Sequence, residues 1–200
     1  MKVIHLLEKI KVEVVVHAAT QIAKNADKER RKQVHAAAND YIFINFHNWR
    51  DGRTHLRILE IGSLNINGTV RDYIQPFAEK YIGIDMQEGP GVNLVYDAAK
   101  YTKPNFFDVV VCAEVFEHTP EWQTIIKKSY KNLVDSGIFI ATMAGEGRHP
   151  HSALDTGAIR EWEHYANIGE WQLKQTLTNI GFKDVSVNVN GNDIRCYGVK

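Results

Sequence analysis

The sequence predicts an α/β protein whose core is a doubly wound, mostly parallel sheet of seven strands that ends in an antiparallel hairpin. From residue 56 onward, short apolar runs of strand length alternate with segments of helical periodicity, which is the pattern of such sheets. Several of these runs stop at a glycine or an acidic residue, as strands do when they deliver the chain to a ligand. Asn190-Gly191 separates the last two runs and predicts the hairpin.

Length and charge set the first limits on function. With 200 residues the chain is large enough to bury a core without disulfides or metals. We expect a helical extension or lid at residues 1–55 and a main domain at 56–200. Lysine plus arginine equals aspartate plus glutamate, at 24 each, so net charge provides no general attraction to nucleic acid or to an anionic membrane. A nucleic-acid partner is therefore not expected.

The cysteine and hydropathy patterns favour a cytoplasmic protein. Cys112 and Cys196 are the only cysteines and form no C-x-x-C pair, which favours a reducing compartment. Charged residues interrupt the apolar stretch 1–16 well before it reaches the length of a bilayer span. We therefore expect neither a signal peptide nor a membrane anchor, and the oligomeric state is left open.

The N-terminal extension is predicted to be helical in three parts. Residues 1–20 match both helical and strand periodicity, and helix is favoured; residues 21–38 are rich in helix formers, with a solvated basic face. Residues 39–55 carry four aromatic side chains: Tyr41, Phe43, Phe46 and Trp49. Their spacing favours packing against the sheet, and a lid over the ligand or substrate is the second interpretation, compatible with the first.

The stretch from Arg57 to Asp85 carries the first functional signal. An apolar strand ends in the turn Glu60-Ile61-Gly62, a short helix follows, and a second apolar strand ends at Asp85. Asp85 follows Gly62 by 85 − 62 = 23 residues, close to the offset of about 20 at which an acidic residue meets a nucleotide ribose. Leu64 and Ile66 stand where a dinucleotide fingerprint has further glycines. Ordinary turn glycines therefore remain an alternative at this point.

Two further strands are predicted to end in polar residues. Residues 92–96 form a run that stops at Asp97-Ala98, and residues 106–112 form the unbroken apolar run of a central parallel strand. That run delivers Glu114-Val115-Phe116-Glu117-His118. Thr119 can cap the helix that follows.

The rest of the chain completes the pattern. A fifth strand at 138–143 leads into a loop at 145–165 that is rich in histidine and charge, and a long loop of this kind is usually functional or mobile. Gly181 closes the last helix before the hairpin. Because parallel strands place their carboxyl ends at one edge of the sheet, the residues at these ends are predicted to border one ligand site: Glu60, Gly62, Asp85, Asp97 and Glu114.

From Arg57 to Lys200 these motifs resemble the class I S-adenosylmethionine-dependent methyltransferases, a Rossmann-like superfamily. The resemblance implies the following cofactor-binding residues: Glu60, Gly62, Ser63, Asp85, Met86, Asp97, Ala98 and Glu114. It implies that Gly62 and Ser63 lie alongside the methionine part of the cofactor and that Asp85 binds both ribose hydroxyls. Met86 would pack against adenine, Asp97 would accept from its amino group, Ala98 would add a backbone contact, and Glu114 would lie near the methionine moiety.

The resemblance implies an enzyme that methylates a small-molecule or sugar-like acceptor and releases S-adenosylhomocysteine. If the acceptor is a hydroxyl, a base assists, and the catalytic candidates are His118 and His151, with His149 as a further histidine of the same loop. A non-catalytic nucleotide-binding module is the alternative from another class of protein. The missing glycines count more against a dinucleotide, which has a pyrophosphate, than against S-adenosylmethionine.

A divalent metal is the second question at this site. Glu114, Glu117 and His118 are spaced i, i+3, i+4 and converge if the segment is helical, and His149 or His151 would complete a carboxylate and imidazole site. This pattern resembles metal-dependent O-methyltransferases that act on small-RNA 3′ ends or on quinone precursors. The sequence favours the alternative, in which Glu117 and His118 only brace the loops around the cofactor, because so short a pattern is easily met by chance.

Overall fold

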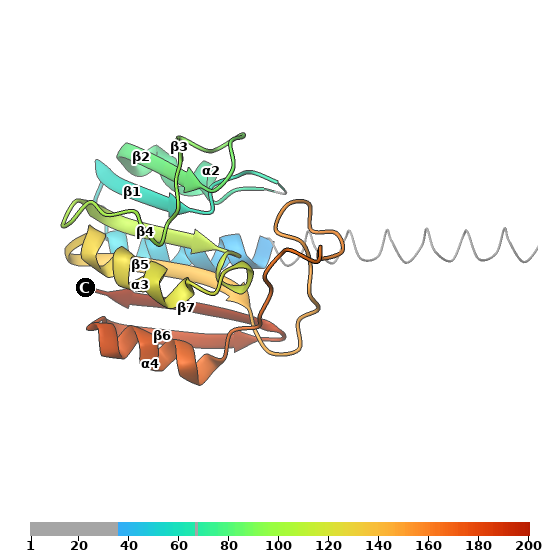
Figure 1. Ribbon diagram of the computed structural model, residues 1–200. Helices are drawn as coiled ribbons and strands as arrows, with labels where there is room; N and C mark the ends of the chain where they lie inside the picture. Colours follow the sequence, from blue (N-terminus) through green and yellow to red (C-terminus); the bar gives the residue numbers. More distant parts are fainter. Residues whose placement is uncertain (1–35, 67) are drawn as a thin grey trace, which may run out of the picture. The chain divides into compact units, whose positions relative to one another are not determined.

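The computed structural model describes residues 36–66 and 68–200. The chain divides into two compact units, Met1–Ala37 and Ala38–Lys200, and the elements below lie in the second unit (Figure 1). The predicted helices of residues 1–35 lie outside the described residues. Among the described residues, no helix combines the length and the apolar character needed to span a bilayer.

The second unit is built on one seven-stranded sheet with the order β3-β2-β1-β4-β5-β7-β6. The strands are β1 (Leu56–Ile61), β2 (Ala78–Asp85), β3 (Leu94–Val95), β4 (Phe107–Ala113), β5 (Leu133–Ala144), β6 (Lys183–Asn190) and β7 (Asp193–Val199). The first five strands pair in parallel, whereas β7 runs antiparallel to both β5 and β6. The predicted doubly wound sheet with a terminal hairpin is confirmed.

The central strands are buried on both faces, and their alternating side chains separate two cores. Val110 and Cys112 of β4 face the side covered by α3 (Trp122–Asn132) and α4 (Glu170–Ile180). Val109 and Val111 face the other side, where the helical residues 38–50 pack beside α2 (Arg71–Ile74), as Figure 1 shows. This two-sided cover explains the near-continuous apolar sequence of β4.

The helical residues 38–50 belong to the core of this unit. Ile42 and Phe46 are fully buried among the side chains of β1 and β4. The sequence places the boundary of the main domain at residues 55–56, whereas the compact unit begins at Ala38, because these aromatic and aliphatic side chains cover one face of the sheet. Packing, the first interpretation of this segment, is what the structure shows.

The short helix after Gly68 agrees with the sequence, whereas the start of α3 does not. Pro76 limits the helix after Gly68 to α2 and the 3-10 turn η1 (Gln75–Phe77), as its missing N–H requires. The predicted cap at Thr119 is wrong, because α3 begins only at Trp122. Thr119 Oγ1 instead accepts a hydrogen bond from the backbone N–H of Glu121 at 3.1 Å.

Candidate active site

The turn after β1 is shaped by backbone geometry. Gly62 has φ +74°, and a Cβ there would lie 2.2 Å from Val115 Cγ2, so only glycine is accommodated. The N–H groups of Gly62 and Ser63 both donate to the carbonyl of Ile84, at 3.0 and 3.1 Å. These donors fasten the turn to β2, and Ser63 is itself buried.

Asp85 stands at the end of β2 with spare acceptor capacity. Its Oδ2 accepts from the N–H of Leu64 and its Oδ1 from the N–H of Gln87, each at 3.1 Å. A carboxylate oxygen accepts about two hydrogen bonds, so each oxygen retains a position for a ribose hydroxyl. The neighbouring Met86 side chain is 69% exposed and offers apolar surface to a ring. These two residues therefore fit an adenosine group.

Glu60 lies at the carboxyl end of β1, as expected, and its carboxylate is occupied by contacts within the chain. Its buried carboxylate accepts from Thr69 Oγ1 at 3.2 Å and pairs with Arg71 Nε at 3.3 Å. Burial raises the pKa of Glu60, and the positive charge of Arg71 opposes that rise. In this structure Glu60 braces the segment that follows the glycine turn.

Asp97 and Ala98 follow β3 as predicted. Asp97 Oδ1 accepts from the N–H of Ala99 at 2.9 Å, and Oδ2 pairs with Lys100 Nζ at 3.0 Å. The Lys100 side chain is exposed, so this ion pair contributes little to stability. Ala98 packs against the core that lies between the sheet and the helices α3 and α4.

Glu114 leaves β4 in a left-handed conformation with φ +55°, which side chains rarely adopt. Its carboxylate pairs with Arg148 Nη1 at 2.9 Å, and the same guanidinium pairs with Asp193 at 2.5 Å. The sharp turn at Glu114 means that only Phe116–His118 form a helical turn, the 3-10 element η2. Glu114 is not in the group of side chains whose ligand atoms lie within 4.8 Å of one another, so the convergence expected for a continuous helix is not found.

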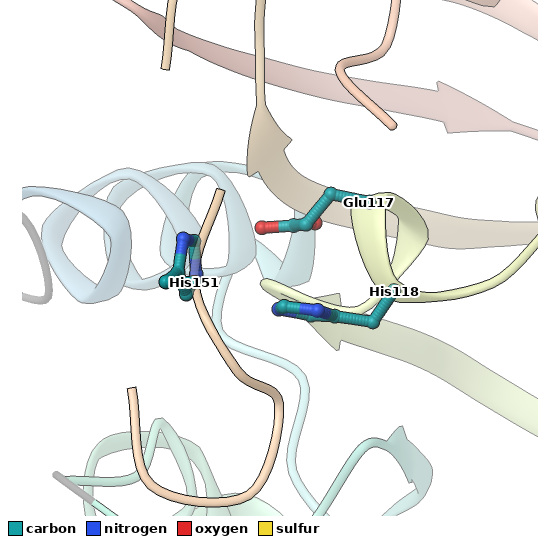
Figure 2. A group of neighbouring side chains, drawn as sticks. All are labelled: Glu117, His118 and His151. Carbon is teal, nitrogen blue, oxygen red and sulfur yellow. The ribbon is translucent and has the colours of Figure 1, made fainter. Parts of the chain in front are cut away.

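Glu117 and His118 instead meet His151. Side-chain ligand atoms of the three residues all lie within 4.8 Å of one another. Figure 2 shows the first two projecting from η2 toward His151, which is carried by the loop after β5. The structure selects His151 over the exposed His149 as the histidine that joins the cluster.

The cluster contains polar atoms that lack partners among the described residues. Glu117 is fully buried, and neither of its carboxylate oxygens makes a hydrogen bond of normal geometry there; the same holds for His118 Nδ1. Burial, together with the nearby Glu114 carboxylate, raises the pKa of Glu117 to about 8. Burial also lowers the pKa of His118 to about 4, which keeps its imidazole neutral. Buried polar atoms of this kind call for a partner.

His151 is oriented by a backbone carbonyl, and Tyr165 packs against the cluster of Glu117, His118 and His151. His151 Nδ1 lies 3.1 Å from the carbonyl oxygen of His149, which can only accept, so Nδ1 carries a proton; in the neutral ring the lone pair is then on Nε2. The Tyr165 ring contacts both imidazoles, with centroids 5.4 Å from His118 and 5.1 Å from His151. Its buried hydroxyl has no hydrogen-bond partner among the described residues.

Sequence reasoning missed Tyr165 and Arg148. Both lie in the loop whose composition marked it as functional, but no spacing rule relates them to β4. Only the fold brings the two ends of this loop back to η2, where the N–H of Ala166 donates to the carbonyl of Glu117 at 2.8 Å.

Comparisons with known proteins agree with this architecture. A family model described as a methyltransferase domain matches residues 17–187. Curated relatives include the ubiquinone biosynthesis O-methyltransferases of Pseudomonas fluorescens strain Pf0-1 and Pseudomonas entomophila strain L48. Each is 28% identical over 127 residues, which cover 54% of this chain and 53% of the relative. The chain thus spans about half the length of the curated relatives it matches.

Solved structures share the fold at low identity. The 1,6-didemethyltoxoflavin-N1-methyltransferase of Burkholderia thailandensis has a TM-score of 0.62 and 14% identity, covering 90% of this chain and 86% of its own. An S-adenosylmethionine-dependent methyltransferase of Archaeoglobus fulgidus has a TM-score of 0.59 and 16% identity, covering 82% and 95%. The chain belongs to the methyltransferase-domain family, and the prediction of a class I S-adenosylmethionine-dependent methyltransferase is confirmed.

Proposed function

We propose that this chain transfers the methyl group of S-adenosylmethionine to a hydroxyl oxygen of a small-molecule or sugar-like acceptor. The observation that supports a hydroxyl acceptor is the cluster of Glu117, His118 and His151, which gathers one carboxylate and two imidazoles beside the carboxyl ends of the strands. The curated relatives named as O-methyltransferases are consistent with an oxygen acceptor. The zero net charge favours a small acceptor over an RNA 3′ end.

Residues along the carboxyl edge of the sheet would bind different parts of the cofactor. Asp85 and Met86 would hold the adenosine part of the cofactor, with Asp97 and Ala98 beside it and the glycine turn at Gly62 on the methionine side. The bound cofactor supplies an electrophilic methyl group on a sulfonium. Positioning the acceptor in line with that group and excluding water account for much of the rate in such transfers.

The cluster handles the acceptor proton. As the acceptor oxygen forms its bond to the methyl carbon and the carbon–sulfur bond breaks, the hydroxyl proton must leave. An imidazole nitrogen of His118 or His151 would accept it. Burial lowers the pKa of His118 to about 4, which leaves that ring unprotonated near neutral pH but makes it a weaker base than an ordinary histidine. These histidines are the proposed catalytic residues.

Calorimetry with S-adenosylhomocysteine tests the cofactor assignment. We expect the protein to bind S-adenosylhomocysteine and not NAD, and Asp85→Ala to weaken binding by about 10-fold to 100-fold, the effect of losing hydrogen bonds to a charged group. Asp72→Ala, which removes an exposed aspartate of α2, is the matched control. Binding of NAD alone would reject the proposal, and binding without turnover of any acceptor would favour a non-catalytic module.

A metal-dependent O-methyltransferase is the second candidate function. It is favoured by the buried oxygens of Glu117, which make no hydrogen bond of normal geometry with the described residues, and by His118 and His151 beside them. These three residues would hold the ion, without Glu114, whose carboxylate pairs with Arg148. A divalent ion there would act as a Lewis acid that lowers the pKa of a bound hydroxyl.

Equilibrium dialysis against magnesium, manganese and zinc, followed by metal analysis, tests this candidate. We expect uptake of one ion per chain with preference for manganese or zinc over magnesium, because two imidazoles and one carboxylate suit borderline metals. Glu117→Gln and His118→Ala should abolish uptake, and His149→Ala, at an exposed histidine of the same loop, should retain it. No uptake by the wild type, or uptake unchanged in Glu117→Gln, would remove the candidate.

A further inference from the structure

The carboxylate of Glu163 closes the loop that carries His151 and Tyr165. Glu163 has a side chain only 5% exposed. Its Oε1 accepts from Ser152 Oγ at 2.7 Å and from the N–H of Ala153 at 3.1 Å. Its Oε2 accepts from the N–H of Arg160 at 2.8 Å and from Arg160 Nη1 at 3.4 Å. Four donors from both halves of the loop therefore converge on Glu163.

The donors are themselves fixed in place. Ser152 is fully buried, and its Oγ also accepts from the N–H of Leu154 at 3.0 Å and from Arg160 Nη1. Arg160 Nη2 bonds Asp155 Oδ2 at 2.7 Å on the outer side. Residues 152–163 thus form a ring closed by side chains, although the structure assigns no helix or strand between β5 and α4.

The cluster residues flank this ring. His151 immediately precedes Ser152, and Tyr165 follows Glu163 by two positions. Both rings pack on His118, with centroids 5.0 Å and 5.4 Å away. The next contact along the chain, from the N–H of Ala166 to the carbonyl of Glu117, ties the far end of the ring to η2.

We propose that Glu163 is a positioning residue that closes the loop at 152–163 and so holds His151 and Tyr165 against His118. The proposal rests on the proposed function for its consequence in catalysis, because the cluster is the site at which the acceptor oxygen is handled. The oxygens of Glu163 are occupied by Ser152, Ala153 and Arg160, so it acts on the ring positions through these neighbours. Its negative charge also acts on His118 through space, and Glu163→Asp, which keeps that charge, separates the two effects.

The hydrogen-bond donors around Glu163 explain why a carboxylate fits this position better than an amide. Every partner of Glu163 is a donor, and a carboxylate accepts with both oxygens. A glutamine there keeps one accepting oxygen and turns an NH₂ group toward the remaining donors. Glu163→Gln is therefore expected to open one side of the ring while leaving the size of the side chain unchanged.

Histidine ring ¹H–¹³C NMR tests the proposal without a known acceptor. In Glu163→Gln, we expect the ring signals of His118 and His151 to shift by more than their linewidths, since ring contacts between His118, His151 and Tyr165 change. The matched control Glu161→Gln removes the same charge from an exposed position in the same loop and should leave both signals in place. Glu163→Asp keeps two accepting oxygens on a shorter stem and should give smaller shifts.

Unshifted His118 and His151 signals in Glu163→Gln, or equal shifts in both glutamine variants, would overturn the proposal. A merely structural role would lower the unfolding temperature and leave the ring signals of the folded protein unchanged, so both are measured. Affinity for S-adenosylhomocysteine should be the same in all variants, because Asp85 and Met86 lie outside the ring.

A second arm separates this proposal from the proposed function. If the wild type takes up manganese, Glu163→Gln should weaken its affinity by about 10-fold to 100-fold, as loss of the groups that orient metal ligands does, whereas Glu161→Gln should not. Unchanged manganese affinity in Glu163→Gln would count against the positioning role. If the wild type takes up no metal, the metal-dependent candidate fails, and the NMR comparison still decides the role of Glu163.

Discussion

His118 and His151 meet edge to face, with ring centroids 5.0 Å apart and an interplanar angle of 86°. One ring comes from the turn after β4 and the other from the loop after β5, and these two parallel strands are neighbours in the sheet. The pairing of β4 with β5 therefore brings the two loops together. The contact also places both imidazoles beside the buried Glu117 carboxylate, at the corner of the sheet where we propose that the acceptor hydroxyl is bound.

The glycine turn after β1 predicts a sharp response to Gly62→Ala. The added methyl group would meet Val115 Cγ2 at a φ of +74°, so we expect a loss of about 2–4 kcal/mol in the free energy of unfolding. Urea unfolding measures it. The double variant Gly62→Ala/Val115→Ala removes the clash and keeps the unfavourable φ, so it should be less destabilised relative to Val115→Ala alone. An equal loss in both backgrounds would show that the Val115 contact has no role.

The ion pairs of Arg148 with Glu114 and Asp193 predict that substitutions at Arg148 and Asp193 have non-additive effects on stability. Its largely buried guanidinium lies between Glu114 and Asp193, so Arg148→Met leaves two carboxylates without their cation. We expect a loss of about 2–4 kcal/mol in the free energy of unfolding, because removing one partner of a buried ion pair is costly. Asp193→Asn should recover part of that loss when it is combined with Arg148→Met. Strictly additive losses in this double-mutant cycle, measured by urea unfolding, would contradict the coupling.

The sequence predicts the fold well because the fold depends on local patterns. The apolar runs of β1, β2 and β4 and the Asn190-Gly191 turn each reflect a rule that acts within a few residues. The position proposed for the cofactor also follows a local rule, since Asp85 is the last residue of β2. The long strand β5 begins before the predicted 138–143 because its early residues follow α3 without a loop.

The cluster of Glu117, His118 and His151 is not predictable in the same way. The i, i+3, i+4 spacing of Glu114, Glu117 and His118 presumes a continuous helix, and the left-handed φ of Glu114 breaks it. The partners of these residues come from a loop without periodicity, and Glu163 organises that loop through side-chain hydrogen bonds. Such contacts depend on three-dimensional closure and leave no regular spacing in the sequence.

The link between β1 and β4 predicts a pH dependence of stability. Asp108 accepts three hydrogen bonds from Arg57, from its backbone N–H and from two guanidinium nitrogens, at 2.8–3.0 Å. Burial alone would raise the pKa of Asp108, but the bonds from Arg57 outweigh it and hold the pKa below its ordinary value of 3.8. A depressed pKa means that this stabilisation is present above pH 3.8 and is lost as the pH falls through the folded-state value.

Urea unfolding of wild type and Asp108→Asn between pH 3 and pH 7 checks this. We expect the wild type to be more stable by about 1–2 kcal/mol at neutral pH, with the difference shrinking below about pH 4. Asp72→Asn, at an exposed aspartate, should show no such trend. A difference that stays constant down to pH 3 would contradict the assignment to Asp108.

Tyr165 predicts opposite effects on stability and activity. Its hydroxyl is buried without a hydrogen-bond partner among the described residues, so the folded protein bears the desolvation cost of that group. Tyr165→Phe removes the hydroxyl and keeps the ring contacts with His118 and His151. We expect the free energy of unfolding of the ligand-free protein to rise by up to about 1 kcal/mol, while methyl transfer slows because the hydroxyl is lost from the site that we propose for the acceptor. Tyr73→Phe, at a half-exposed tyrosine outside the cluster, should change neither quantity. A Tyr165→Phe protein that is destabilised in thermal unfolding would show that the hydroxyl already has a hydrogen-bond partner in the ligand-free protein. Tyr165 would then no longer be proposed to contact the acceptor.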